Sequence, residues 1–251
     1  MARAPSVDLA SATWTDVRDA DVDAAVLPVG STEQHGPHAP LGTDAFHAQS
    51  VAEEGAAAHD GEVVVAPTVP VGIAEEHRAF DGTLWVSPAT LREYVDEVVR
   101  SLADVTDVVV VVNGHGGNVV ALREATAGVT RDGDCYAVPF TWFDSVDSDA
   151  AAREAGVDSV EMGHGGPVET ALLRHTHPGL VREDRTERAR DEGAPSWGEW
   201  VAGVNLAYDA VEFTESGAVG DPTAGPAEMG KTLLDTAGAA LAEVLTAARE
   251  R

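Results

Sequence analysis

The stretch DVVVVVN, from Asp107 to Asn113, places five consecutive valines between two polar residues. A short apolar run rich in β-branched residues is typical of a strand that is buried on both faces of a parallel sheet. Three further runs have the same character: AAVLPV (Ala24 to Val29), EVVVAP (Glu62 to Pro67) and CYAVPF (Cys135 to Phe140). The sequence therefore predicts a sheet in which these four runs are strands.

Candidate helices lie between and after these runs. Pro88 suits a first helical turn, and Ser87 before it suits the N-cap. We expect helices at Asp44 to His59, Pro88 to Val105, Asn118 to Arg131, Val160 to Thr176 and Pro226 to Arg249. Strands and helices in alternation predict an α/β fold, a mostly parallel β-sheet flanked by helices on both faces. The length suits a single domain spanning residues 1–251.

Acidic residues dominate the charge of the chain. There are 43 aspartates and glutamates against 16 lysines and arginines, the formal net charge is -27, and Lys231 is the single lysine. Such a surface repels phosphates, which excludes nucleic acid as a partner. Carboxylates that repel one another in dilute buffer are screened in molar salt. We interpret this composition as adaptation to a salty cytoplasm, with an ordinary acidic protein as the alternative.

Cysteine content and hydropathy indicate the compartment. Cys135 is the single cysteine, so no internal disulfide can form, which fits a reducing environment. The N-terminal residues lack a long apolar segment, and no apolar stretch approaches the ~18 residues of a membrane span. We therefore expect a cytoplasmic protein with no membrane partner.

Potential metal ligands follow two of the predicted strands. PVGSTEQHGPHAPLGTD begins where the first strand should end, and NGHGGN begins where the third should end. Because the carboxyl ends of parallel strands share one edge of a sheet, both segments should open on the same side. Glu33 and His35 are two residues apart, so an extended backbone points both side chains the same way. Asp44 follows a turn rich in Gly and Pro that can fold it back over this pair.

A third cluster, EMGHGGPVETALLRH, adds His164 and Glu169 at the expected start of a helix. Glu, His and Asp together suit a catalytic Zn, Mn or Fe site better than a closed structural site, which usually recruits Cys. An aspartate shared by two ions is a common way to build a hydrolytic centre. For Glu33 and His35 taken alone, a polar pair without metal is the alternative interpretation.

Five sequence blocks, in this order, resemble those of the creatininase family of metal-dependent hydrolases. They are LPVGSTEQHGPHAPLGTD, EEHRAFDGTL, VVVVNGHGGN, GHGGPVET and GAVGDPTAGPAEMGK, and they span most of the chain. The resemblance implies an α/β sandwich, two divalent metal ions, a small-molecule substrate and hydrolysis of a C-N bond that is not a peptide bond. It also implies a homo-oligomer, either a hexamer or a dimer.

The resemblance also implies the metal ligands. It assigns Glu33, Asp44 and His115 to one ion, and His35, the bridging Asp44 and a further carboxylate to the other. Enzymes that act on creatinine have Tyr and Glu where this chain has Gly116 and Gly117. Glycine offers no side chain to a metal, and resemblance to the glycine-containing branch of the family implies that this ligand comes from the later VET, which assigns the remaining carboxylate to Glu169.

Catalytic and substrate roles follow from the same resemblance. His164 is expected to carry the proton to the leaving nitrogen, with Glu169 as the second catalytic group. Support of a metal ligand is the alternative role of His164. The residues expected to contact substrate are His77, Gly116, Gly117 and Trp142. For His77 a structural hydrogen bond is the alternative, and for Trp142 it is burial in the core.

Two further departures from the family pattern are Pro167, where many relatives have a glutamate, and Asp81, where a proline is usual. The glycine-rich NGHGGN block resembles the archaeal formamide deformylase branch. That branch acts on 2-amino-5-formylamino-6-ribosylaminopyrimidin-4(3H)-one 5'-monophosphate in riboflavin and deazaflavin biosynthesis, and this is the expected function. The alternatives are a creatinine amidohydrolase, a mycofactocin precursor peptide peptidase and a noncatalytic metal-dependent binding protein.

Overall fold

The structure is a computed structural model that describes residues 7–251. Its main sheet has the strand order β1-β3-β2-β4-β5, and every neighbouring pair is parallel. The strands are β1 (Val7–Asp8), β2 (Val22–Val29), β3 (Glu62–Val65), β4 (Val108–Asn113) and β5 (Tyr136–Thr141). The four predicted strands are confirmed, and the valine-rich β4 lies inside the sheet, between β2 and β5.

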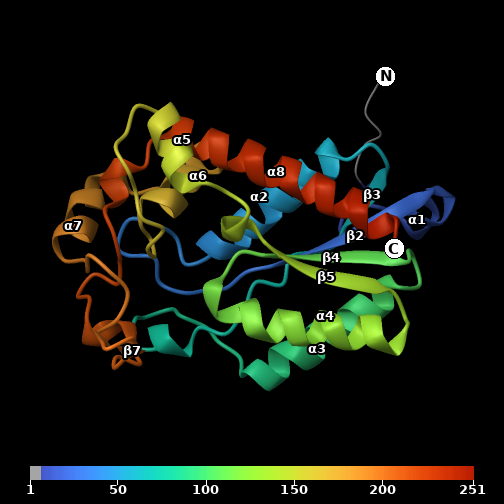
Figure 1. The fold of residues 1–251 in the computed structure, drawn as a ribbon, viewed down its shortest axis with the longest axis horizontal. Coiled ribbons are helices and arrows are strands. Elements are labelled where there is room, and N and C mark those ends of the chain that lie inside the picture. Colours follow the sequence, from blue (N-terminus) through green and yellow to red (C-terminus); the bar gives the residue numbers. More distant parts are fainter. Residues whose placement is uncertain (1–6) are drawn as a thin grey trace.

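Helices cover both faces of the sheet, as predicted (Figure 1). One face is covered by α3 (Pro88–Leu102) and α4 (Val119–Asp132), and the other by α2 (Thr43–Ala58), α5 (Ser148–Glu154), α6 (Pro167–Thr176) and α8 (Ala227–Arg249). Val109 and Val111 belong to the core beneath α3 and α4, whereas their neighbours in β4 belong to the core beneath α2 and α8. The alternation of side chains along a strand therefore divides the valine run between two cores.

Shorter elements complete the chain. They are α1 (Trp14–Asp19), α7 (Thr186–Asp191), a two-stranded antiparallel sheet of β6 (Trp200–Val201) and β7 (Val204–Asn205), and short 3-10 helices that include η1 (Glu75–His77), η2 (Gly116–Asn118) and η3 (Trp142–Asp144). Among residues 7–251, no helix has the length and hydropathy needed to cross a bilayer.

One predicted helix begins later than expected. The sequence predicts a helix from Val160, but α6 begins at Pro167. Gly163 and Gly165 have φ values of +67° and +54°, and His164 between them pairs with Val219 in an isolated bridge. Left-handed backbone at two positions cannot continue an α-helix. His164 therefore lies in an extended segment that precedes the helix.

The predicted shared edge is also present. Val29 at the end of β2 pairs with Asn113 at the end of β4, so the segments that follow both strands leave the sheet together. Gly114 must be a glycine here, because a Cβ at this position would lie 2.2 Å from the backbone oxygen of Asp44. This close approach brings the segment after β4 against the first turn of α2.

We predict that salt stabilises this fold. The few cations are shared among carboxylates: Arg100 alone contacts Asp96, Asp132 and Asp134, and within residues 7–251 most other acidic groups have no lysine or arginine partner to offset their repulsion. Screening shortens the range of that repulsion from ~10 Å at 0.1 M salt to ~3 Å at 1 M. The melting temperature should therefore rise from dilute buffer to molar KCl. A parallel series with sucrose at the same osmolality controls for solute exclusion, and an unchanged or lower melting temperature in KCl would contradict the prediction.

Candidate metal centre

Three carboxylates converge at the carboxyl edge of the sheet. Glu33 lies in the segment after β2, while Asp44 and Glu169 lie in the first turns of α2 and α6. Their exposed fractions are 0%, 1% and 6%. Within residues 7–251 their ion-pair partners are all histidines, with no lysine or arginine among them. Buried negative charge of this density requires compensation by cations.

Two histidines face these carboxylates at short distances. The Nε2 atom of His35 lies 3.0 Å from Asp44 Oδ1 and 3.9 Å from Glu169 Oε2. The Nδ1 atom of His115 lies 3.1 Å from Glu33 Oε1 and 3.3 Å from Asp44 Oδ2. Asp44 thus lies between the two rings and offers one oxygen to each. The structure brings together all five residues that the sequence predicts as ligands.

The outward-facing nitrogen of each ring donates to a backbone carbonyl. His35 Nδ1 donates to the oxygen of Glu33 at 3.1 Å, and His115 Nε2 donates to the oxygen of Ile73 at 2.6 Å. In the neutral rings, which are the form that binds a metal ion, these bonds leave the lone pair of the other nitrogen directed at the carboxylates. Metal-binding histidines are oriented in the same way, by a hydrogen bond from the nitrogen that does not bind the ion.

Unpaired oxygen atoms provide an independent test of fit for a metal. Both carboxylate oxygens of Glu33 and the Oδ2 atom of Asp44 are buried without a hydrogen-bond partner. Such atoms lose their hydration on folding, and leaving them without a hydrogen bond is costly even with histidine nitrogens 3.1 to 3.9 Å away. Glu33, His35 and Asp44 also offer three ligand atoms within 4.8 Å of one another, and so do His35, His164 and Glu169. The donor set therefore fits one or more divalent ions.

The electrostatics of the site also favour a cation. Burial alone would lower the pKa of His35, but the charges of Asp44 and Glu169 outweigh it and raise this pKa to about 10. Burial also opposes ionisation of His115, yet Glu33 and Asp44 raise its pKa well above the usual value. Burial raises the pKa of Glu169 to about 7. Protons and metal ions compete for such groups, so high proton affinity reflects strong attraction for any cation.

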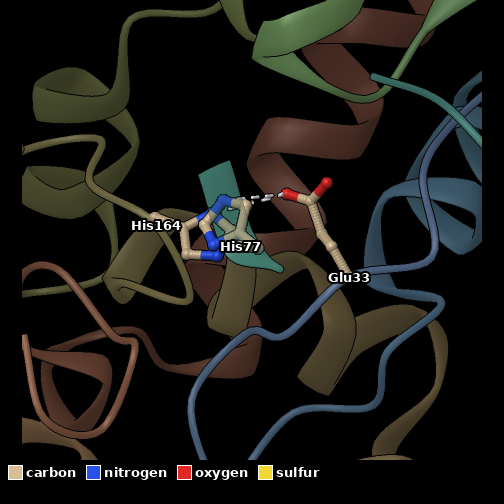
Figure 2. Close-up of side chains that lie close together, drawn as sticks. All are labelled: Glu33, His77 and His164. Carbon is tan, nitrogen blue, oxygen red and sulfur yellow. Dashed lines mark ion pairs between the residues drawn. The ribbon is translucent and has the colours of Figure 1, made fainter. Parts of the chain in front are cut away.

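Two more histidines, His77 and His164, lie next to the carboxylate of Glu33. Figure 2 shows the rings of His77 and His164 side by side, with the carboxylate of Glu33 facing them. Their centroids are 4.3 Å apart, and Glu33 Oε1 lies 3.5 Å from His77 Nε2 and 3.9 Å from His164 Nδ1. Burial, followed by the positive charge of His35, lowers the pKa of His164 well below its usual value. Both His77 and His164 also line the adjoining cavity.

That cavity has a volume of about 450 Å³ and reaches the proposed metal centre at Glu169 and His115. Glu169, His115, Gly116 and Gly117 also line it, so the predicted substrate contacts other than Trp142 are part of its wall. A Cβ at Gly116 would meet nothing within 4 Å, whereas one at Gly117 would lie 2.5 Å from His115 Nε2. The His115 ring thus occupies the space that a glutamate at position 117 would need.

Trp142 does not line the cavity, contrary to its expected contact with substrate and in agreement with the alternative of burial in the core. Trp142 is fully buried and packs edge-on against His47 and Phe143, so the structure places it in the core and not in the cavity wall. Trp197 lines the cavity instead, 5.5 Å from the ring of His77 and 5.8 Å from that of His164. The position of Trp197 in the cavity wall was not predicted from the sequence, because no motif surrounds this residue. The available signal was its position in a segment rich in Gly, Pro and Ser, typical of a binding loop.

Comparisons with known proteins show the family of this chain. The family model described as "Creatininase: Creatinine amidohydrolase" matches residues 10–245. A mycofactocin precursor peptide peptidase from Mycolicibacterium smegmatis is 37% identical over 217 residues, which cover 84% of this chain and 80% of that protein. A creatinine amidohydrolase from Pseudomonas putida is 30% identical over 201 residues, covering 72% of this chain and 75% of that protein.

A solved structure described as "Creatininase Mn" has the same fold. It superposes with a TM-score of 0.77 at 23% sequence identity, and the superposition covers 96% of this chain and 98% of that chain. With a family match over nearly its whole length and a relative at 37% identity, the chain belongs to the creatininase family.

Proposed function

We propose that this creatininase-family hydrolase uses divalent metal ions to cut an amide bond near the C-terminus of a small precursor peptide. The mycofactocin precursor peptide peptidase from Mycolicibacterium smegmatis supports this choice by its 37% identity. From the sequence we expected a formamide deformylase that hydrolyses a non-peptide C-N bond, with a mycofactocin precursor peptide peptidase as one alternative. The function proposed here is that alternative, and the bond that is cut is an amide bond of a peptide.

The charge of the cavity wall is the structural observation that carries the choice. Among residues 7–251, the lining includes Glu76 and Glu161 but no lysine or arginine. A nucleotide 5'-monophosphate needs cationic groups or a helix N-terminus to hold its phosphate, and of the two the side chains and backbone of this wall offer the start of η2 at Gly116 and Gly117. Trp197, Phe143 and Met162 instead give the wall an aromatic and apolar part. Such a wall suits the apolar side chains of a peptide end, whose terminal carboxylate carries one negative charge, better than a nucleotide monophosphate, whose phosphate carries about two.

The metal ligands proposed from the sequence match the geometry of the site. Glu33, Asp44 and His115 would hold one ion, and His35, Asp44 and Glu169 the other. When bound, such ions polarise a carbonyl and make water a nucleophile near neutral pH. The carboxylates and rings that hold them are fixed by burial and by hydrogen bonds to the backbone. The site therefore requires little rearrangement to bind them.

His164 is the proposed proton carrier. Its Nε2 donates to the backbone oxygen of Gln34 at 2.6 Å, which leaves the lone pair of Nδ1 free on the side of Glu33 and the cavity. The lowered pKa keeps the ring neutral, so Nδ1 can accept a proton and then return it to the leaving nitrogen. Glu169 is the proposed second catalytic group: without a bound ion, burial raises its pKa to about 7.

A three-substrate assay tests the proposal. We expect the purified protein, loaded with zinc or manganese, to hydrolyse a peptide ending in Val-Tyr with a higher kcat/KM than either creatinine or the formylaminopyrimidine nucleotide. Turnover of the nucleotide above that of the peptide would restore the deformylase function. Metal binding without turnover of any of the three would favour the noncatalytic binding protein. An inactive Asp44→Ala variant, assayed in parallel, controls for contaminating peptidases.

A further inference from the structure

Gln34 lies between the two proposed ligands Glu33 and His35 in the sequence, and its own side chain hydrogen-bonds other residues. It is buried, with an exposed fraction of 5%. Its Oε1 accepts a hydrogen bond from the backbone N-H of Gly36 at 2.9 Å, and its Nε2 donates to the backbone oxygen of Gly217 at 3.0 Å. The same Nε2 lies 2.7 Å from His77 Nδ1. Gln34 therefore connects the metal-binding segment to His77.

The amide of Gln34 can adopt only one orientation. Rotating it by 180° would place its N-H groups against the N-H of Gly36 and its oxygen against the oxygen of Gly217. Gly217 has a φ of +85°, and a Cβ there would lie 1.8 Å from Gln34 Oε1. A glycine is needed at this position for the backbone to approach the amide so closely. The block Gly217–Lys231, which the ligand assignment does not account for, thus begins with a residue that holds Gln34 in place.

This orientation determines where His77 carries its proton. The Nε2 of Gln34 is a donor, so His77 Nδ1 must be the acceptor and carries no hydrogen. The neutral ring then has its proton on Nε2. That atom lies 3.5 Å from Glu33 Oε1, on the edge of the ring that is directed at the Glu33 carboxylate (Figure 2). His77 therefore presents an N-H group to the reacting centre.

We propose that Gln34 is a positioning residue that keeps the proton of His77 on Nε2, and that this N-H donates a hydrogen bond to the substrate carbonyl oxygen as it becomes negative. Water gives a proton to Nδ1 of His164 as it adds to the carbonyl carbon, the C-N bond then breaks, and the leaving nitrogen takes that proton from His164. His77 donates a hydrogen bond throughout and loses no proton. The role of His77 rests on the proposed hydrolysis, whereas the proton position set by Gln34 does not.

The substitution Gln34→Glu tests the proposal. A carboxylate at this position accepts a hydrogen bond from His77, so the proton should move to Nδ1 and leave Nε2 without one. Turnover should fall about 10²- to 10³-fold, as when one donor to a developing oxyanion is lost, with a much smaller change in KM. The matched control is Gln49→Glu, because Gln49 is exposed on α2 and hydrogen-bonds only Glu53. Metal content is measured for both variants.

The readout is ¹⁵N NMR of the zinc-loaded full-length chain labelled at histidine, with His77 assigned by comparison with His77→Phe. In the unsubstituted protein, a protonated Nε2 and a bare Nδ1 are expected at His77. A protonated Nδ1 or a zinc-bound Nε2 in that spectrum would overturn the proposal, whether or not Gln34→Glu folds. An inverted proton position with unchanged turnover would overturn the role of His77. Failure of the peptide assay alone would leave the NMR result intact and refute only the proposed substrate.

Discussion

Asp44→Ala is expected to empty both ion positions and to abolish turnover. Asp44 offers Oδ1 to the side of His35 and Oδ2 to the side of His115, and it is the proposed ligand that the two ions share. Metal ions supply several kcal/mol of transition-state stabilisation in hydrolases, and each ~1.36 kcal/mol is a factor of ten in rate. Turnover should therefore fall by at least ~10³-fold. Elemental analysis should show a loss of both ions and not of one.

Two further variants make this result interpretable. Asp44→Asn keeps the size of the side chain but removes its charge, so metal loss there points to the charge and not to a cavity. Glu228→Ala is the matched control, because Glu228 also lies in the first turn of a helix, α8, but is exposed. It should retain metal and activity. Full metal content in Asp44→Ala would rule out Asp44 as the shared ligand.

The arrangement of strands could be predicted because a strand buried on both faces leaves a clear signal. Five consecutive valines, as in β4, favour such a strand over a helix or a loop, and the alternation with helices indicated a parallel sheet. The parallel sheet in turn predicted that the segments after β2 and β4 would meet at one edge. The convergence of Glu33, Asp44 and His115 follows from this topology and needed no knowledge of side-chain positions.

The late start of α6 could not be read from the same patterns. Val160 to Thr176 has the composition of a helix, but the bridge between His164 and Val219 joins segments 55 residues apart in the sequence. Such a pairing depends on the tertiary fold, which local propensity does not contain. The positions of Trp142 and Trp197 depend on the fold in the same way.

The choice of substrate was beyond the sequence motifs. Gly116 and Gly117 indicated a branch without the glutamate ligand, which the resemblance linked to the deformylase. The proposal of a peptidase rests instead on the 37% identical relative and on the wall of the cavity, where Glu76 and Glu161 come from segments far apart in the chain. The homo-oligomer, the cytoplasmic location and the adaptation to salt stay predictions.

The roles of Glu169 and His164 are separable because their loss should have different effects on metal content. Glu169→Gln should empty one position, since His35 and Asp44 alone hold that ion weakly. Its amide oxygen can still accept the hydrogen bond that Gly165 N-H now donates to Glu169 Oε2 at 2.6 Å, so the local structure should survive. His164→Ala should keep both ions, while turnover drops by the ~10²- to 10⁴-fold typical of a general acid or base.

The structure makes metal stoichiometry the decisive measurement for this pair. His35, His164 and Glu169 offer ligand atoms within 4.8 Å of one another, so His164 is close enough to bind an ion itself. Activity alone would fall in both variants and could not distinguish a ligand from a proton carrier. His175→Ala, which removes an exposed histidine from α6, is the control for loss of a ring from this region. If Glu169→Gln retains both ions and His164→Ala loses one, the two roles are reversed: the histidine is the ligand, and the carboxylate, with its pKa raised to about 7 by burial, is left as the group that carries the proton.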